Sequence, residues 1–113
     1  MKKLRRGRLI KKLDSLFSKY IRRKDTINDI AKCVSCGVER HWKELQCGHF
    51  QSRTHYSTRW NEFNVGVQCI SCNIFKNGQQ DLFSRYLDKT YGEGTSNELF
   101  VKSQKLAKFT TNE

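Results

Sequence analysis

The sequence has no apolar run that approaches the roughly 20 residues of a membrane-spanning helix, although 36% of its 113 residues are hydrophobic. Its basic beginning, MKKLRRGRLIKKL, is not followed by the apolar stretch of a secretory signal peptide. Apart from two pairs of cysteines, it has no internal repeat and no low-complexity segment. These absences argue against a membrane protein or a secreted protein, and we expect a cytoplasmic location.

Acidic residues are also scarce. Asp and Glu number 11 against 22 Lys and Arg, for a net charge of +11. The imbalance is concentrated in residues 1–32, which hold 12 basic and 3 acidic residues. A basic arm on a nearly neutral body favours a nucleic-acid partner, because bound cations release counterions from phosphates. A solvated tail and an anionic membrane surface are the alternatives. The candidate DNA contacts in the arm are Arg5, Arg6, Arg8, Lys11 and Lys12.

Four cysteines form two matched pairs, Cys33 with Cys36 and Cys69 with Cys72. Each pair can bring two thiolates onto one tetrahedral zinc ion. Without secretion, metal binding is favoured over two disulfides or four unrelated thiols. A structural Zn²⁺ would compensate for the modest core of so short a chain, because its binding free energy contributes to folding. The fifth cysteine, Cys47, is expected to be a small buried hydrophobe.

Apolar spacing predicts a small α+β domain. Helices are expected over residues 8–24, with a basic outer face, and over 25–30, 71–76, 80–91 and about 96–108; Thr95 and Glu98 match a capping box. A strand or hairpin is expected within 40–50, a polar loop over 51–62 and a strand around 65–67. Within one domain, we distinguish a basic helical arm (1–32), a zinc-bound core (33–92) and a C-terminal helix (93–113).

Several polar residues are predicted to meet where strand, loop and helix converge. His49 ends one predicted strand, and Asn64 lies beside the next. On a helix, Asn73 and Asn77 would share one face. A histidine opposite two amide oxygens could hold a water and a divalent cation, the arrangement needed to cleave a phosphodiester.

Each of these residues also has a structural explanation. His49 could fill a core position, and Asn64 and Asn73 could be turn or cap residues. Asn77 precedes Gly78, a common helix-ending pair. His55 could contact phosphate or nothing, and His41 beside Trp42 is expected to be structural.

Basic and aromatic residues alternate in the loop. Arg53 and Arg59 flank His55. Tyr56 lies between the two arginines, and Trp60 follows Arg59. Arginine can grip phosphate with two hydrogen bonds, and aromatic rings can stack on exposed bases. We therefore expect DNA contacts from Arg53 and Arg59, with Lys76 adding another. The alternative is a surface loop with its aromatics packed beneath it, which we expect for Trp60.

The segment QCGHFQSRTHYSTRWNEFNVGVQCISCN resembles the phage NinG (Rap) recombination proteins and, more broadly, the HNH or His-Me finger nucleases. The resemblance covers about residues 15–92. It implies a zinc-stapled ββα-metal core with flanking helices and Mg²⁺- or Mn²⁺-dependent DNA cleavage. For NinG-like proteins it further implies branched substrates, such as Holliday junctions or D-loops, and action in the bacterial host cell. Symmetric cutting of a junction would favour a homodimer.

By the same resemblance, His49 is the general base and Asn64 braces the loop and orients His49. Asn73 is a catalytic residue and ligand for the catalytic metal, with Asn77 as a second ligand. Gly48 departs from the pattern, because many HNH nucleases place Asp or His immediately before the catalytic histidine. Cation binding could then rely on substrate phosphates, or His55 could substitute. Amide ligands favour Mg²⁺ or Mn²⁺ over catalytic zinc. The alternative is a catalytically inactive, zinc-stabilised DNA-binding module.

Overall fold

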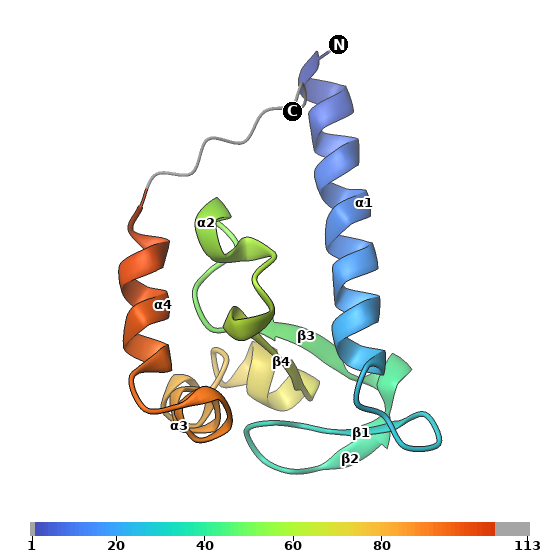
Figure 1. The fold of residues 1–113 in the computed structure, drawn as a ribbon. Helices are drawn as coiled ribbons and strands as arrows, with labels where there is room; N and C mark the ends of the chain where they lie inside the picture. Colours follow the sequence, from blue (N-terminus) through green and yellow to red (C-terminus); the bar gives the residue numbers. More distant parts are fainter. Residues whose placement is uncertain (1, 106–113) are drawn as a thin grey trace.

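The computed structural model describes residues 2–105 of the chain. Two small sheets lie between a long N-terminal helix and two C-terminal helices (Figure 1), which confirms the predicted α+β class. In chain order the elements are α1 (Lys2–Arg23), β1 (Ile30–Lys32), β2 (Glu39–His41), the 3₁₀ turn η1 (Trp42–Glu44), β3 (Gln46–His49), α2 (Tyr56–Arg59), the 3₁₀ turn η2 (Glu62–Asn64), β4 (Val65–Gln68), the π-helix η3 (Ser71–Phe75), α3 (Gln80–Tyr91) and α4 (Thr95–Ser103).

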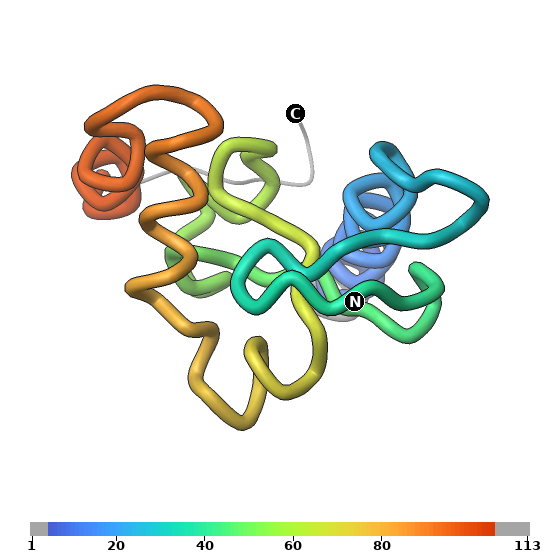
Figure 2. The backbone as a smooth tube through the Cα atoms, turned by 90° about the horizontal axis from the view of Figure 1, so that it is seen from below, coloured from blue at the N-terminus to red at the C-terminus, as the bar shows by residue number. Residues whose placement is uncertain are grey.

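Each sheet is an antiparallel pair of strands next to a cysteine pair. Strands β1 and β2 are joined by residues 33–38, which carry the first pair. In the other sheet, His49 lies opposite Val65, and the second pair begins directly after β4. The Val34 amide donates to the Val67 carbonyl at 2.8 Å, which ties the first cysteine loop to β4. Viewed from below, α1 and α4 are seen nearly end-on at opposite sides of these strands (Figure 2).

The hydrophobic core is small and lies under the C-terminal helices. Phe83, Leu87 and Leu99 are almost completely buried, where α3 meets α4. Phe50, which follows β3, and Val34 pack against this cluster. The helix predicted over 80–91 is confirmed. Burial of this apolar cluster brings α3 and α4 against the β3–β4 sheet and its flanking loops.

Helix α1 is only partly buried. The predicted helix over 8–24 is confirmed and begins earlier, but its apolar stripe does not pack as the amphipathic pattern suggested. Ile21 is 2% exposed, whereas Leu9, Leu16 and Tyr20 are at least 50% exposed. The N-terminal half of α1, which carries Leu9, extends past the sheets (Figure 1), whereas Leu16 and Tyr20 are exposed in its C-terminal half. Although α1 has 22 residues, no helix in the described part of the chain combines the length and apolar character needed to cross a bilayer.

The helical stretch expected over residues 25–30 is wrong. Asn28 and Asp29 adopt φ angles of 52° and 64°, a left-handed conformation that Asn and Asp tolerate better than most residues. A bridge between Ile27 and Ile30 closes this turn and leads into β1. A tight turn therefore replaces the helix and lets the chain reverse between α1 and the first cysteine loop.

The capping box expected at the last helix is also wrong. Helix α4 begins at Thr95, and the acceptor for its first turn comes from α3. The carboxylate of Asp88 accepts hydrogen bonds from the Ser96 amide at 2.8 Å and the Ser96 hydroxyl at 3.0 Å. Helix α4 is thus capped by a side chain of α3, a tertiary contact that the local sequence around Thr95 does not indicate. The part of the predicted helix beyond residue 105 lies outside the described residues.

The strand predictions around 40–50 and 65–67 are confirmed, and the predicted loop over 51–62 contains the single turn α2. Strand β3 also explains why position 48 is glycine. A Cβ atom at Gly48 would lie 2.0 Å from Oε1 of Gln68. Gln68 is completely buried and cannot easily move, because its Nε2 donates to the Ser35 hydroxyl and the Gly78 carbonyl, both at 2.8 Å. The buried amide of Gln68 therefore excludes any side chain at position 48.

We predict that Gly48→Ala lowers the free energy of unfolding by about 1–3 kcal/mol, the usual cost of overpacking a core. Gly7→Ala is the matched control, because a Cβ there meets nothing within 4 Å. In the interior of α1 it should raise stability by about 0.5–1 kcal/mol. Denaturant unfolding of the zinc-loaded variants measures both. Wild-type stability in Gly48→Ala would show that Gln68 yields easily.

Candidate metal clamp and candidate active site

The four paired cysteines converge on one point. Their Sγ atoms all lie within 4.8 Å of one another, and those of Cys36 and Cys69 are 3.7 Å apart. Four thiolates around zinc, at about 2.3 Å each, would be separated by about 3.8 Å. A disulfide would need about 2.05 Å, and all five cysteines are free. The cluster can therefore hold a structural metal such as zinc, as the spacing predicted.

Backbone geometry prepares both cysteine pairs for a metal. The amide of Cys36 lies 3.5 Å from Sγ of Cys33, and the amide of Cys72 lies 3.5 Å from Sγ of Cys69. Such N–H···S contacts stabilise thiolate charge. Gly37 has a φ of +81°, which permits the tight turn after the first pair. We refer to Cys33, Cys36, Cys69 and Cys72 as the cysteine clamp.

Cys47 takes no part in the cysteine clamp. Burial raises the pKa of its thiol to about 12, so the thiol stays protonated at neutral pH. A protonated thiol is a poor nucleophile, and Cys47 lies outside the group of four sulfurs that could hold a metal. The sequence predicted a small buried hydrophobe, and the structure places Cys47 as a half-buried residue.

A cavity of about 670 Å³ contains the candidate active site. His49 enters it from the end of β3, Asn73 from η3 and Arg53 from the loop after β3. Its charged lining is predominantly basic. Arg22, Lys43 and Arg53 line it, and the one lining acid among the described residues is Asp14 of α1. This charge balance suits a phosphate group better than a free cation.

His49 is held in a defined orientation. Its Nε2 atom lies 2.9 Å from the carbonyl oxygen of Arg59. Because a carbonyl can only accept a hydrogen bond, Nε2 must carry the proton, and Nδ1 is the basic nitrogen of the neutral ring. Burial lowers the pKa of His49 below its usual value, with a smaller contribution from the positive charge of Arg53. The ring is therefore neutral at pH 7 and can accept a proton.

Arg59 does not fill the role expected from the sequence. Its Nε and Nη2 atoms donate to Oδ1 and Oδ2 of Asp14 at 3.0 and 2.6 Å, and its side chain is only 14% exposed. Burial acts to raise the pKa of Asp14, but the hydrogen bonds and charge of Arg59 outweigh it and the pKa is lowered. The Arg59 guanidinium, which the sequence predicted to bind phosphate, is therefore paired with Asp14 instead. Arg53, 3.7 Å from Asp14 and 60% exposed, remains at the cavity.

Trp60 also supports this ion pair. Its Nε1 donates to Oδ1 of Asp14 at 3.0 Å, and its ring stacks on Tyr56 at a centroid distance of 5.9 Å. Trp60 thus packs beneath the loop, as expected.

Asn64 braces the loop after β3. It is completely buried; its Oδ1 accepts from the Gln51 amide at 2.8 Å, and its Nδ2 donates to the carbonyls of Gln51 and Thr58 at 3.1 Å. The expected bracing geometry is present. These side-chain bonds reach the loop rather than His49, so any influence of Asn64 on the imidazole is indirect.

Asn73 and Asn77 do not share a helix face. The predicted helix is a π-helix, in which the Lys76 amide donates to the Ser71 carbonyl five residues earlier at 2.9 Å. Asn73 lines the cavity, and its Nδ2 donates to Oε1 of Gln46 at 2.7 Å. Asn77 is exposed in the turn that follows, with a φ of 52°. The structure therefore places Asn77 as a helix terminator, outside the cavity.

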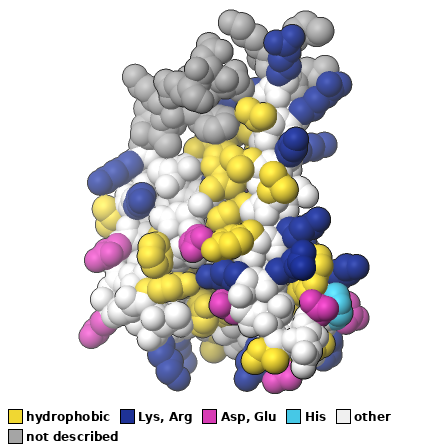
Figure 3. Space-filling view, turned by 45° about the vertical axis from the view of Figure 1, so that its right-hand side comes forward, with side chains coloured by type: hydrophobic (Ala, Val, Ile, Leu, Met, Phe, Trp, Pro, Cys, Tyr) yellow, Lys and Arg dark blue, Asp and Glu magenta, His cyan; other side chains and the backbone are white. Residues whose placement is uncertain are grey.

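The remaining predicted residues lie away from the cavity. His55 precedes the first residue of α2 and does not line it, and Lys76 is exposed in the turn after η3. His41 stacks on Trp42 and accepts a hydrogen bond from the Lys43 amide, consistent with a structural role. Basic side chains follow α1 along one face of the molecule (Figure 3). Of the arm residues, Arg6 is half-buried, while the others are exposed: Arg5, Arg8, Lys11 and Lys12.

Sequence reasoning missed Asp14, Gln46, Arg22 and Lys43 at the cavity. A signal existed for Asp14, which is the single acid among ten basic residues in α1. No comparable signal marks Gln46, because its contact with Asn73 depends on how η3 turns after β4.

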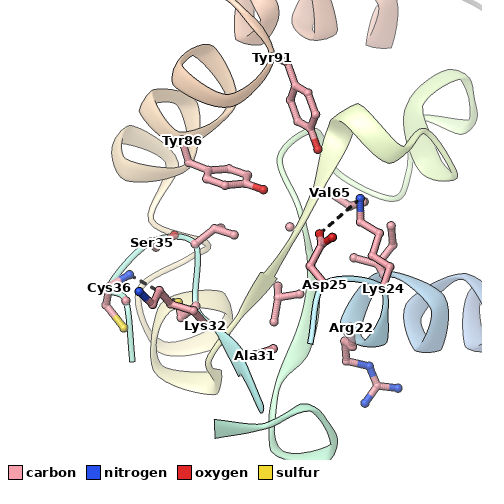
Figure 4. A pocket seen from close by; sticks show the side chains of 16 residues that line it. Arg22, Lys24, Asp25, Ala31, Lys32, Ser35, Cys36, Val65, Tyr86 and Tyr91 are labelled. Carbon is pink, nitrogen blue, oxygen red and sulfur yellow. Dashed lines mark hydrogen bonds and ion pairs between the residues drawn. The ribbon is translucent and has the colours of Figure 1, made fainter. Parts of the chain in front are cut away.

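A second cavity, of about 540 Å³, lies beside the cysteine clamp (Figure 4). Among the described residues that line it there is no histidine. Asp25 is paired with Lys24 at 3.8 Å, and burial raises the pKa of Tyr86 to about 12. Cys33 and Cys36 of the cysteine clamp also line this cavity, so its ionisable thiols belong to the candidate structural metal site.

Fold and site together define a small α+β protein with a four-cysteine clamp that can hold a metal, beside a basic, histidine-containing cavity. Residues 1–113 match the family described as bacteriophage lambda NinG protein, and the chain belongs to this family. Searches of curated proteins and of solved structures found no match.

We predict that Cys36→Ser or Cys69→Ser releases bound zinc and abolishes cooperative thermal unfolding. The reason is that structural zinc binding, about 10–16 kcal/mol in small domains, contributes directly to folding. Cys47→Ala is the matched control and should keep one zinc per chain. Elemental analysis and thermal melts measure both properties. A Cys36→Ser protein with full zinc content and wild-type melting would contradict the clamp.

We also predict that His49 titrates below pH 6.5 in the folded protein, as followed by nuclear magnetic resonance of its imidazole. The unfolded chain binds this proton first as the pH falls, since an unperturbed histidine has a pKa of about 6.5. The free energy of unfolding attributable to His49 is therefore retained above that pH and lost on acidification. The His49→Ala spectrum assigns the signal. A midpoint at or above 6.5 would contradict the buried neutral ring.

Proposed function

We propose that the protein is a metal-dependent DNA endonuclease of the HNH, or His-Me finger, class that acts on branched recombination intermediates. The observation that carries this proposal is the environment of His49. Its Nε2 is engaged by a backbone carbonyl, its Nδ1 is the basic nitrogen, and the surrounding cavity is lined by Arg22, Lys43 and Arg53. A neutral base in a basic cavity is suited to activating water next to a phosphodiester.

The arrangement of elements supports the class. Strands β3 and β4 pair antiparallel, and η3 follows β4, so the order is strand, strand, helix. His49 ends the first strand and Asn73 lies on the helix, and both reach the same cavity. The cysteine clamp fixes the start of that helix, because Cys69 precedes it and Cys72 lies within it. This order supports the ββα-metal arrangement that the sequence resemblance implies, with a π-helix in the α position.

Each lining residue then has a defined task. His49 Nδ1 accepts the proton of the attacking water. Arg53, which is exposed at the cavity, holds a non-bridging phosphate oxygen, and Lys43 adds positive charge. Arg59 is excluded from this work by Asp14. The exposed basic residues of α1 supply affinity for DNA that does not depend on sequence.

The donor set fits a weakly held Mg²⁺ or Mn²⁺. Asn73 Oδ1 accepts no hydrogen bond from the described residues and is the available hard ligand in the cavity. Asp14 is occupied by Arg59, and Gly48 contributes no side chain. Mg²⁺ commonly retains waters and is held jointly with substrate phosphates. When bound, the ion would supply charge stabilisation at the phosphate and the leaving oxygen.

The lack of a side chain at Gly48, where a metal ligand would be expected, favours a second candidate, a zinc-stabilised DNA-binding module without activity. A protein of that kind keeps the cysteine clamp and the basic helix but needs no base in the cavity. It predicts DNA binding without cleavage. A single DNA-cleavage assay therefore distinguishes the two candidate functions.

We predict that the wild-type protein cleaves a four-way junction in Mg²⁺ or Mn²⁺ faster than nicked or linear duplex. His49→Ala should lower the single-turnover rate by about 10²- to 10⁴-fold, the usual contribution of a general base. Its DNA affinity and melting temperature should change little. His55→Ala is the matched control and should retain cleavage, because His55 lies outside the cavity.

Two outcomes decide between the candidates. If wild type and His49→Ala bind DNA equally and leave every substrate intact, the binding module is the correct function. If His55→Ala loses activity while His49→Ala keeps it, the cavity has been misassigned.

A further inference from the structure

The orientation of His49 depends on a backbone carbonyl that is itself held in place. That carbonyl belongs to Arg59, whose side chain forms two hydrogen bonds with Asp14, at 3.0 and 2.6 Å. Asp14 lies 45 positions earlier in the chain, near the middle of α1. A continuous chain of contacts therefore joins the N-terminal helix to the candidate base.

We propose that Asp14 is a positioning residue for His49. By fixing Arg59, it holds the carbonyl that keeps the imidazole proton on Nε2 and leaves Nδ1 basic. The inference rests on the proposed function only in calling His49 the base. The positional effect on the imidazole can be measured whether or not the protein cleaves DNA.

Three features favour a dedicated contact over a chance ion pair. Both partners are largely buried, with 19% of Asp14 and 14% of Arg59 exposed. The geometry is bidentate, which restricts the guanidinium to one plane. Arg59 Nη1 also donates to the Arg53 carbonyl at 2.7 Å, so the ends of the intervening segment are joined.

The geometry also gives a structural role to Asp14, the one acid of α1. In a helix with ten basic residues, an unpaired carboxylate would lower the affinity for DNA. Here its charge is cancelled by Arg59 inside the fold, and Trp60 satisfies Oδ1 further. Helix α1 thus has two tasks, since exposed basic residues occupy its surface and Asp14 reaches the site.

The test compares Asp14→Asn with Asp25→Asn, which removes the same charge from an exposed carboxylate paired with Lys24. With only three histidines in the chain, ¹⁵N-labelled imidazole spectra can resolve His49. Wild type and Asp25→Asn should show His49 as a single Nε2–H tautomer. Asp14→Asn should show a mixture of tautomers, and single-turnover junction cleavage should fall about 10²-fold, as expected for a misplaced base. Zinc content should not change.

A pure His49 Nε2–H tautomer and full cleavage in Asp14→Asn would overturn the inference. An inactive wild type would instead refute the proposed function, while the spectra would still decide the role of Asp14. If Asp14→Asn loses zinc or fails to fold, Arg59→Lys takes its place. That variant keeps the charge but loses the bidentate fork, so a wild-type tautomer there would overturn the inference equally.

Discussion

The convergence of four cysteine sulfurs is the constraint on which the rest of the structure depends. Residues 33–36 follow β1, and residues 69–72 follow β4, so one cluster joins both sheets. The buried apolar cluster around Phe83, Leu87 and Leu99 lies under α3 and α4 and is small. It could not by itself fix the start of η3 relative to β3. Because η3 carries Asn73 and β3 carries His49, the cysteine clamp indirectly sets the dimensions of the cavity.

Within the cavity, burial and charge act in opposite directions on neighbouring groups. Burial keeps His49 neutral, whereas pairing with Arg59 keeps Asp14 ionised despite burial. The lining that remains is basic and lacks an unpaired carboxylate among the described residues. Such a site attracts phosphate before it attracts a divalent ion. If the protein is the nuclease proposed above, substrate and metal would bind cooperatively, each providing charge that the other needs.

The sequence predicted what depends on local spacing and could not predict what depends on packing. The cysteine cluster, both flanking strands and the helix over 80–91 follow from motif spacing and periodicity. The Asp88 cap, the Asp14–Arg59 pair and the contact between Gln46 and Asn73 join residues 8 to 45 positions apart. Arg59 shows the difference most clearly. Its position between aromatic residues indicated phosphate binding, yet a carboxylate from another element occupies it.

The π-helix η3 has a consequence for comparing relatives of this protein. A π turn accommodates more residues than an α turn, so it behaves as a local insertion of one residue. An alignment that assumes an ordinary helix after Cys72 will shift every later position in this segment against the true three-dimensional equivalence. Asn77 illustrates the error, since an α-helical register placed it above Asn73, whereas η3 ends at Phe75 and Asn77 lies in the turn that follows. Equivalent residues in a relative that has an ordinary α-helix here should therefore be assigned with a gap allowed between Cys72 and Gly78.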